Sequence, residues 1–145
     1  MLIVVDINVL WQSLKGKGSV SRRILDLIIS QKVEIALSEA VFFEYEEMLK
    51  RPYSLDNFRL TVTHADNLLD LIAAIGRWYK IFYRFPPLLK VERDNMLVEL
   101  AVTAGAKFLV TNNIEAFVVR PGLEFDNLTI VTPIQFIQIW RGFYE

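Results

Sequence analysis

The chain has no cysteine and only one histidine among its 145 residues. Without cysteine there is no disulfide framework, no thiolate metal site and no cysteine nucleophile, so the composition favours a reducing, cytoplasmic setting. The one histidine, His64, lies at an expected helix start. That position disfavours a Ser-His-Asp hydrolase, and an HExxH zinc site is excluded because it needs two histidines.

Long apolar runs and an excess of one charge are also absent. The apolar stretch 68–75 is broken by Asp70, and the apolar start ends at Asp6, so we expect no membrane span and no signal peptide. Lys and Arg number 16 against 17 Asp and Glu, for a formal net charge of -1. A nucleic-acid partner must then be held by local basic patches. The segment 16–19 lacks the glycine and Ser/Thr positions of a phosphate loop, which disfavours a small phosphorylated ligand.

Apolar residues make up 53% of the chain, enough to bury the core of one domain over residues 1–145. Short β-branched runs without polar alternation alternate with stretches of helical spacing, which predicts a parallel sheet covered on both faces. We therefore expect an α/β fold, a three-layer α/β/α sandwich with a central parallel sheet of four to five strands. The expected strands are 2–5, 33–37, 107–111 and 128–132, with a possible fifth at 78–84; the expected helices are 21–30, 39–50, 64–75, 94–104 and 133–140.

Polar side chains follow the expected strands, where ligands gather in open parallel sheets. Several are carboxylates, which repel one another at one point unless a hard cation such as Mg²⁺ or Mn²⁺ neutralises them. The candidates are Asp6 and Asn8 after the first strand, Glu44, Glu46 and Glu47 in the next helix, Asp94 at a helix start, and Thr111, Asn112, Asn113 and Glu115 after the third strand.

Each acidic candidate also has a purely structural interpretation. Asp6 and Asn8 are good turn residues, and Asp94 is a good N-cap. Glu44 and Glu46 both border the apolar stripe of their helix, so spacing alone does not choose between them.

Five segments, in order, resemble the PIN-domain family: VVDINVL (4–10), LSEAVFFEYEEML (37–49), DNMLVELA (94–101), AKFLVTNN (106–113) and IVTPIQF (130–136). The resemblance implies an α/β/α sandwich and a metal-dependent ribonuclease, similar to the toxin of VapBC-like toxin–antitoxin pairs. It further implies that Asp6, Glu44 and Asp94 hold Mg²⁺ or Mn²⁺, which selects Glu44 over Glu46. Asn8, Thr111 and Asn113 then take supporting roles.

One position departs from that family pattern. Asn112 and Asn113 stand where Gly-Asp is usual, so the fourth acid is replaced by an amide, for which Glu115 is a candidate substitute. This departure raises a second hypothesis, a catalytically weakened PIN-like domain that binds RNA or a protein.

Two local patches could attract RNA despite the net negative charge. The first, with no acid between its members, is Lys15, Lys17, Arg22 and Arg23. The second includes Arg77, Lys80, Arg84, Lys90 and Arg93, interleaved with aromatic residues on which unpaired bases could stack. The structural alternative for the second patch is that its aromatics belong to the core.

The chain is also expected to associate with other proteins. Its mean hydropathy is +0.32, it has three tryptophans, and Phe43 lies on the outer side of its expected helix. Such a chain has more apolar surface than a small monomer hides easily, which predicts a homodimer or, by the resemblance, an antitoxin partner.

Overall fold

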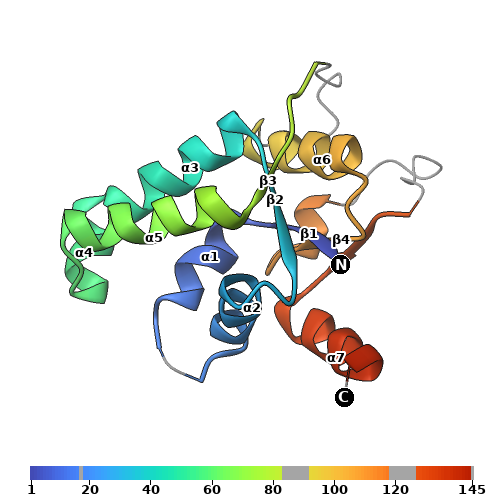
Figure 1. The fold of residues 1–145 in the computed structure, drawn as a ribbon, viewed down its shortest axis with the longest axis horizontal. Helices are drawn as coiled ribbons and strands as arrows, with labels where there is room; N and C mark the ends of the chain where they lie inside the picture. Colours follow the sequence, from blue (N-terminus) through green and yellow to red (C-terminus); the bar gives the residue numbers. More distant parts are fainter. Residues whose placement is uncertain (17, 83–91, 118–126, 145) are drawn as a thin grey trace.

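The computed structural model describes residues 1–16, 18–82, 92–117 and 127–144, and within them five short strands form one sheet (Figure 1). The strand order is β3-β2-β1-β4-β5, and every neighbouring pair is parallel. The strands are β1 (Leu2–Val5), β2 (Glu34–Leu37), β3 (Arg77–Trp78), β4 (Phe108–Val110) and β5 (Thr129–Val131). The predicted central parallel sheet is confirmed.

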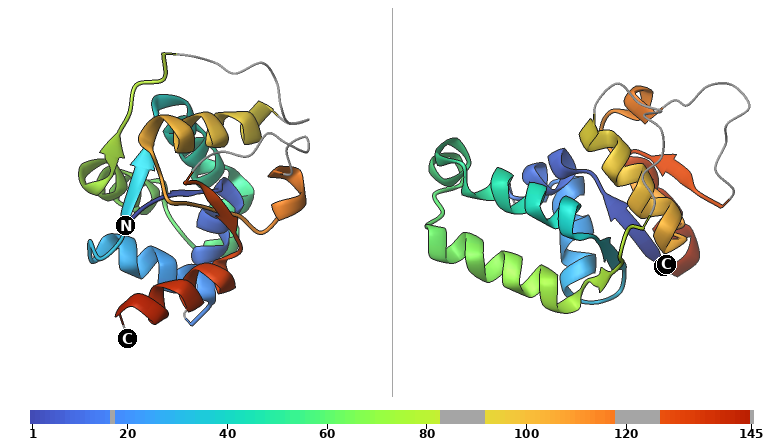
Figure 2. Two further views of the ribbon diagram at one scale, coloured as in Figure 1. Left: turned by 90° about the vertical axis from the view of Figure 1, so that its right-hand side faces the viewer. Right: turned by 90° about the horizontal axis from the view of Figure 1, so that it is seen from above.

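Helices cover both faces of the sheet, as the sandwich prediction requires. Helix α6 packs against β1, β2 and β4 on one side, while α2 and α7 pack together on the other (Figure 1). Helices α3 and α5 lie side by side and extend away from the sheet, with α4 at the far end (Figure 2, right). The helices are α1 (Ile7–Ser13), α2 (Val20–Ile29), α3 (Glu39–Lys50), α4 (Pro52–Phe58), α5 (Val62–Ile75), α6 (Glu92–Ala104), the short 3₁₀ helix η1 (Ile114–Phe117) and α7 (Pro133–Tyr144).

Side chains at the helix starts explain where several helices begin. Ser19 and Ser38 each accept a hydrogen bond from the backbone N–H three residues later, at 3.1 and 3.2 Å. Thr61 and His64 form a reciprocal capping box at the start of α5, with distances of 3.1 and 3.4 Å. Pro133 occupies the first position of α7, where no intrahelical N–H is required. The single histidine therefore has a structural role.

Two features differ from the sequence prediction. The edge strand β3 covers residues 77–78 rather than 78–84, because its one partner, β2, ends at Leu37, where the chain turns into α3. Residues 83 and 84, and the loop expected at 85–88, lie outside the described residues. Helices α1 and α4 were not expected, because each has seven residues and is too short to show a repeated apolar period.

The core lies on both faces of the central strands. Residues 3–5 of β1 are at most 2% exposed, and the same burial extends to the end of β2 and to β4. Tyr45, on α3, is completely buried, and its hydroxyl donates a hydrogen bond to the backbone oxygen of Val5 at the end of β1. This bond fixes α3 to the strand that leads into Asp6. Within the described ranges, no helix has the length and apolar character needed to cross a membrane.

Replacing Tyr45 by phenylalanine tests that contact. Tyr45→Phe keeps the ring but leaves the Val5 oxygen without the hydroxyl donor, so we expect the free energy of unfolding to fall by about 1–3 kcal/mol. The matched control is Tyr53→Phe, whose parent side chain is 70% exposed and should change stability by less than about 0.5 kcal/mol. Urea denaturation of the three proteins makes the comparison, and equal losses would contradict it.

Candidate active site at the carboxyl edge of the sheet

One residue from each strand end contributes to a polar row along the carboxyl edge of the sheet. The register pairs Val5 with Val110, Leu37 with Trp78, and Val110 with Val131, and β1 pairs with β2 in continuous register. The next residue of every strand therefore stands level with its neighbours, with strands about 4.8 Å apart. In strand order this row is Tyr79, Ser38, Asp6, Thr111 and Thr132.

Asp6 behaves differently from the other helix-starting residues of this row. Ser38 and Thr132 cap α3 and α7 with their side chains, at 3.2 Å in both cases. Asp6 stands at the N-cap of α1 but makes no side-chain capping bond. Its carboxylate is 6% exposed and instead accepts a hydrogen bond from the Thr111 hydroxyl at 2.7 Å. An aspartate that served only to start the helix would cap it, so these contacts favour the functional interpretation of Asp6.

The Thr111 side chain links Asp6 to the loop after β4. Its Oγ1 donates to Asp6 and accepts from the backbone N–H of Asn113 at 3.1 Å. The side chains of Asn113 and Glu115 are exposed, and the Asn112 amide donates to Gln12 on α1 at 3.1 Å. Of these residues, Thr111 bonds directly to the Asp6 carboxylate, whereas Asn113 is connected to it only through its backbone N–H, which bonds to Thr111.

Asp94 is near enough to Asp6 for the two carboxylates to repel each other. Burial raises the pKa of Asp94, the negative charge of Asp6 raises it further, and the Arg93 guanidinium partly opposes both effects. Asp94 is the third residue of α6, which begins at Glu92, so its interpretation as an N-cap is wrong. Two aspartates from opposite parts of the sequence therefore share one electrostatic environment.

Tyr45 experiences the same charge. Burial raises the pKa of its hydroxyl, and Asp6 raises it further, so the hydroxyl stays protonated and remains the donor to Val5.

Glu44 is the acid of α3 that faces inward. Its side chain is 22% exposed against 42% for Glu46, which pairs with Lys50 at 3.7 Å. Glu44 Oε2 lies 3.5 Å from Nε of Arg93, a contact between charges, since that Nε makes no hydrogen bond within the described part of the chain. The structure thus separates two glutamates that spacing left equivalent, and it gives Arg93 a partner on the protein itself.

The donor atoms fit a hard divalent cation at the two aspartates. Both supply carboxylate oxygens, and the pKa of Asp94, raised first by burial and further by the charge of Asp6, reflects negative charge that a cation would offset. Glu44 is directed to Arg93, and among the described residues no three acidic, histidine or cysteine side chains converge closely enough to hold a metal ion. Of the predicted set, Asp6 and Asp94 are thus the two acids that influence each other and that carry the oxygen ligands Mg²⁺ or Mn²⁺ prefers.

The first basic patch lies around α1 and the start of α2. Lys15 is exposed, and its Nζ lies 5.1 Å from the centre of the Trp11 ring. Arg22 forms an ion pair with Asp26 at 3.2 Å, and Arg23 is half-buried on the same helix. Lys15 is thus the cation of this patch that stands on an aromatic surface.

The second basic patch is only partly described. Lys17 of the first patch and Arg84 of the second lie outside the described residues, and Arg93 is engaged with Glu44. Trp78 and Phe82 are 45% and 78% exposed, so the alternative that places the aromatics of this patch in the core is wrong for these two side chains.

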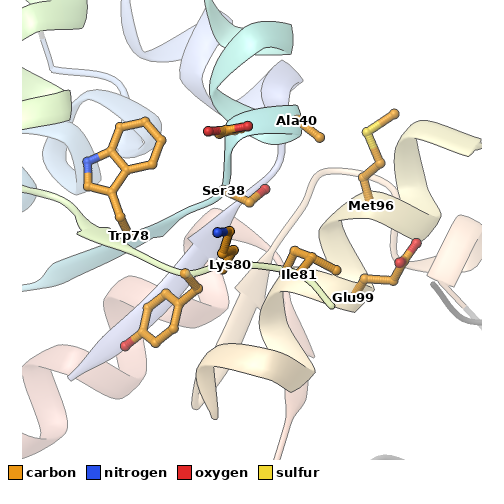
Figure 3. Close-up of a pocket in the computed structure, with 9 residues that line it drawn as sticks. Ser38, Ala40, Trp78, Lys80, Ile81, Met96 and Glu99 are labelled. Atoms are coloured by element: carbon orange, nitrogen blue, oxygen red, sulfur yellow. The ribbon is translucent and has the colours of Figure 1, made fainter. Parts of the chain in front are cut away.

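A cavity of about 580 Å³ lies between the start of α3, the segment at the end of β3, and α6 (Figure 3). Residues that line it include Ser38, Trp78, Lys80, Met96 and Glu99. Its described lining does not include Asp6, Glu44 or Asp94, but it contains Ser38, the neighbour of Asp6 in the polar row, and Met96, two residues after Asp94.

Sequence reasoning missed three residues of this site. Ser38 could have been found, since it directly follows a buried strand just as Asp6 does. Tyr45 was placed correctly in the apolar stripe, but the stripe does not show the partner of its hydroxyl. Glu99 is 8% exposed on α6, and no sequence signal separates a buried glutamate in a helix from a solvated one.

Comparison with known proteins gives a match to one family model and matches to solved structures. The model of the family described as PIN domain matches residues 2–115. Among solved structures, the chain is similar to VapBC2 from Rickettsia felis, crystallised bound to a DNA fragment from its promoter, with 17% identity over 91% of this chain and 98% of that chain and a TM-score of 0.61. No curated protein matches the chain.

These matches agree with the features described above. The structural neighbour supports the fold, since at this identity a likeness speaks for the arrangement of the chain alone. The family model covers the strand that leads into Asp6, the helix that carries Glu44, and the segment from Asp94 to Thr111. The chain belongs to the PIN-domain family.

Proposed function

We propose that this protein is a metal-dependent endoribonuclease that cleaves RNA phosphodiester bonds, and that it is the toxin of a toxin–antitoxin pair. The observation that carries the proposal is Asp6, an N-cap residue that does not cap its helix and is held by Thr111 beside Asp94. Membership of the PIN-domain family and the fold likeness to a VapBC2 structure support it. The proposal includes two protein partners, an antitoxin and a second copy of this chain in a homodimer.

Each side chain has a defined part in the proposed reaction. Asp6 and Asp94 would hold Mg²⁺ or Mn²⁺ through their carboxylate oxygens, and the Thr111 hydroxyl keeps Asp6 in one orientation. When bound, the cation supplies neutralisation of charge on the phosphate oxygens and a lowered pKa for the attacking water. Tyr45 keeps its proton and so adds no negative charge at the site. No histidine base is needed in this scheme.

Metal binding by Glu44 would require its contact with Arg93 to change. Glu44 would join the two aspartates as a third ligand after its contact with Arg93 breaks. Arg93 would then be released to contact the RNA backbone, as predicted from the sequence, and phosphate is a natural partner for guanidinium. Asn8 is exposed on α1, two residues after Asp6, and Asn113 and Glu115 are exposed after β4, two and four residues beyond Thr111. These three residues remain candidates for supporting roles.

The second hypothesis, a catalytically weakened domain that binds RNA or a protein, is also favoured by specific observations. Glu44 is paired with Arg93, and Asn113 brings no charge to the position where the family usually has an acid. The two hypotheses differ in one measurement, because only the nuclease cleaves RNA in a manner that requires a divalent cation.

Asp6→Asn is the direct test of the nuclease. Asparagine has the shape of aspartate and can still accept the Thr111 hydrogen bond, so the fold should remain while the charge that holds the cation is lost. We expect cleavage of a fluorescent single-stranded RNA in Mg²⁺ or Mn²⁺ to fall by more than about 100-fold, beyond the usual range for supporting residues. Asp70→Asn, an exposed change on α5, is the matched control. Cleavage by Asp6→Asn at the wild-type rate would exclude this site.

Asp94→Asn should separate stability from activity. Because the pKa of Asp94 is raised in the folded protein, ionising it costs stability as the pH rises above the ordinary range of an aspartate. Asparagine removes that cost, so the variant should melt at a higher temperature than the wild type at pH 7, with a gain that disappears towards pH 3–4. The same variant should lose metal-dependent cleavage. Thermal melts at the two pH values in EDTA, with Asp70→Asn as control, make the test; a lower melting temperature at pH 7 would contradict it.

Asn113→Asp tests the position where the usual fourth acid is missing. The backbone N–H of Asn113 donates to the Thr111 hydroxyl, which in turn donates to Asp6. A carboxylate at position 113 would therefore increase the negative charge near the site. We expect a lower melting temperature in EDTA and a binding affinity for Mn²⁺ that is tighter by about 10–100-fold. Metal titration followed by melts measures both. If neither quantity changes, Asn113 is too remote to act as the fourth position.

A further inference from the structure

Three aromatic side chains from two helices pack together where α4 meets α1. They are Trp11 on α1 and Tyr53 and Phe58 on α4, and together they are called the aromatic platform below. The rings of Trp11 and Tyr53 are parallel to within 5°, with their centres 6.4 Å apart. The ring of Phe58 meets Trp11 edge-on, with the two centres 5.1 Å apart.

The platform is held in place by the protein, yet part of its surface is open to solvent. Nε1 of Trp11 donates a hydrogen bond to Oγ of Ser54 at 3.2 Å, and Ser54 is only 2% exposed. Trp11 and Phe58 are half-buried, whereas Tyr53 is 70% exposed. Fixed aromatic rings with an exposed face are the surfaces on which unpaired nucleic-acid bases stack, because every base has a flat face of its own.

The segments that carry the platform are basic, although the whole chain has a net charge of -1. Nζ of Lys15 lies 5.1 Å from the centre of the Trp11 ring. Arg51 and Arg59 are exposed at the two ends of α4, and within the described ranges no ion pair involves any of these three cations. The one acid from Arg51 to Arg59 is Asp56, and α1 has none. Cations beside exposed rings favour a partner that has both negative charge and flat bases, which describes single-stranded nucleic acid.

Helix α1 connects the platform to the candidate active site. It begins directly after Asp6, and Trp11 is five residues beyond Asp6, which is about 7–8 Å along a helix that rises 1.5 Å per residue. The next residue, Gln12, accepts a hydrogen bond from the side chain of Asn112 in the loop after β4. A strand whose phosphate lies at Asp6 would therefore meet the platform within a few nucleotides.

We propose that the aromatic platform binds unpaired bases of the RNA strand next to the cleaved phosphodiester, with Tyr53 as the exposed stacking surface and Lys15 as a contact to the phosphate backbone. The inference rests on the proposed function for its substrate class. It adds a binding element that is separate from the two aspartates. It also predicts that single-stranded RNA binds more tightly than a duplex, whose bases already stack on one another.

Binding without cleavage tests the platform independently of catalysis. Fluorescence anisotropy in EDTA measures the affinity for a labelled single-stranded RNA of about ten nucleotides, and Tyr53→Ala should weaken it by about tenfold, within the range for one stacked base. Tyr53→Phe retains the ring and should restore most of the affinity. Phe143→Ala is the matched control, since Phe143 is 65% exposed and lies 4.9 Å from Lys107, just before β4. Equal affinities of Tyr53→Ala and the wild type would overturn the proposal.

Salt dependence separates the charge of Lys15 from stacking. One phosphate contact contributes roughly 0.7 to the slope of log affinity against log salt concentration for a single strand, so Lys15→Gln should reduce the slope by about that amount. Tyr53→Ala should leave the slope unchanged. Lys32→Gln, an exposed change just before β2, is the control. An unchanged slope in Lys15→Gln would overturn the assignment of Lys15.

A second measurement covers the case in which circular dichroism shows that Tyr53→Ala does not fold. The Lys15→Gln slope and the wild-type preference for a single strand over a duplex of the same length then decide the proposal. Equal binding of the two RNA forms by the wild type would overturn it.

The outcomes also separate this inference from the nuclease proposal. Weaker RNA binding by Tyr53→Ala in EDTA, without any metal-dependent cleavage by the wild type, would support the platform and remove the nuclease. Metal-dependent cleavage with equal RNA binding by Tyr53→Ala and the wild type would keep the nuclease and overturn the platform. Oligo-glutamate peptide binding that is lost in Tyr53→Ala, with RNA binding unchanged, would assign the platform to an acidic protein segment and overturn the proposal.

Discussion

The burial and mutual repulsion of the Asp6 and Asp94 carboxylates are the constraint on which the rest of the site depends. The Thr111 hydroxyl stabilises one carboxylate, and the Arg93 guanidinium partly offsets the charge of the other. Tyr45 stays neutral beneath them. Without a cation, burial and this repulsion together hold the pKa of Asp94 above its ordinary value. These charged residues therefore make the protein less stable than neutral residues at the same positions would, as is common at functional sites.

The fold brings these charges together with few residues because strand ends serve also as helix starts. Three residues of the polar row, Ser38, Asp6 and Thr132, each begin a helix directly after a strand. Two of them use their side chains for capping, and the third leaves its carboxylate to the site. Helices α3, α4 and α5 follow β2 and form an arm that extends from the sheet. Through α3, this α3–α5 arm places Tyr45 against the end of β1 and Glu44 against Arg93 of α6.

The sequence predicted the parallel sheet, the sandwich and the family, because buried strands and their polar ends leave a local pattern. It did not predict α1 or α4, which are too short for that pattern. It left Glu44 and Glu46 equivalent, and only the contact with Arg93 on a distant helix separates them. The role of Asp94 as a helix cap was wrong, since α6 begins earlier. The cavity was out of reach for the same reason, because its walls come from three separate segments.

Because the strand ends are level, the place of an insertion or deletion decides whether the site keeps its geometry. Side chains alternate between the two faces of a strand, so inserting or deleting one residue within β1 would turn Asp6 away from Thr111 while leaving the composition of the chain almost unchanged. Length changes in the α3–α5 arm beyond Tyr45, or in the connections between elements, leave the strand register as it is. We therefore expect the chain to tolerate them better than changes within β1, whose four residues set the position of Asp6.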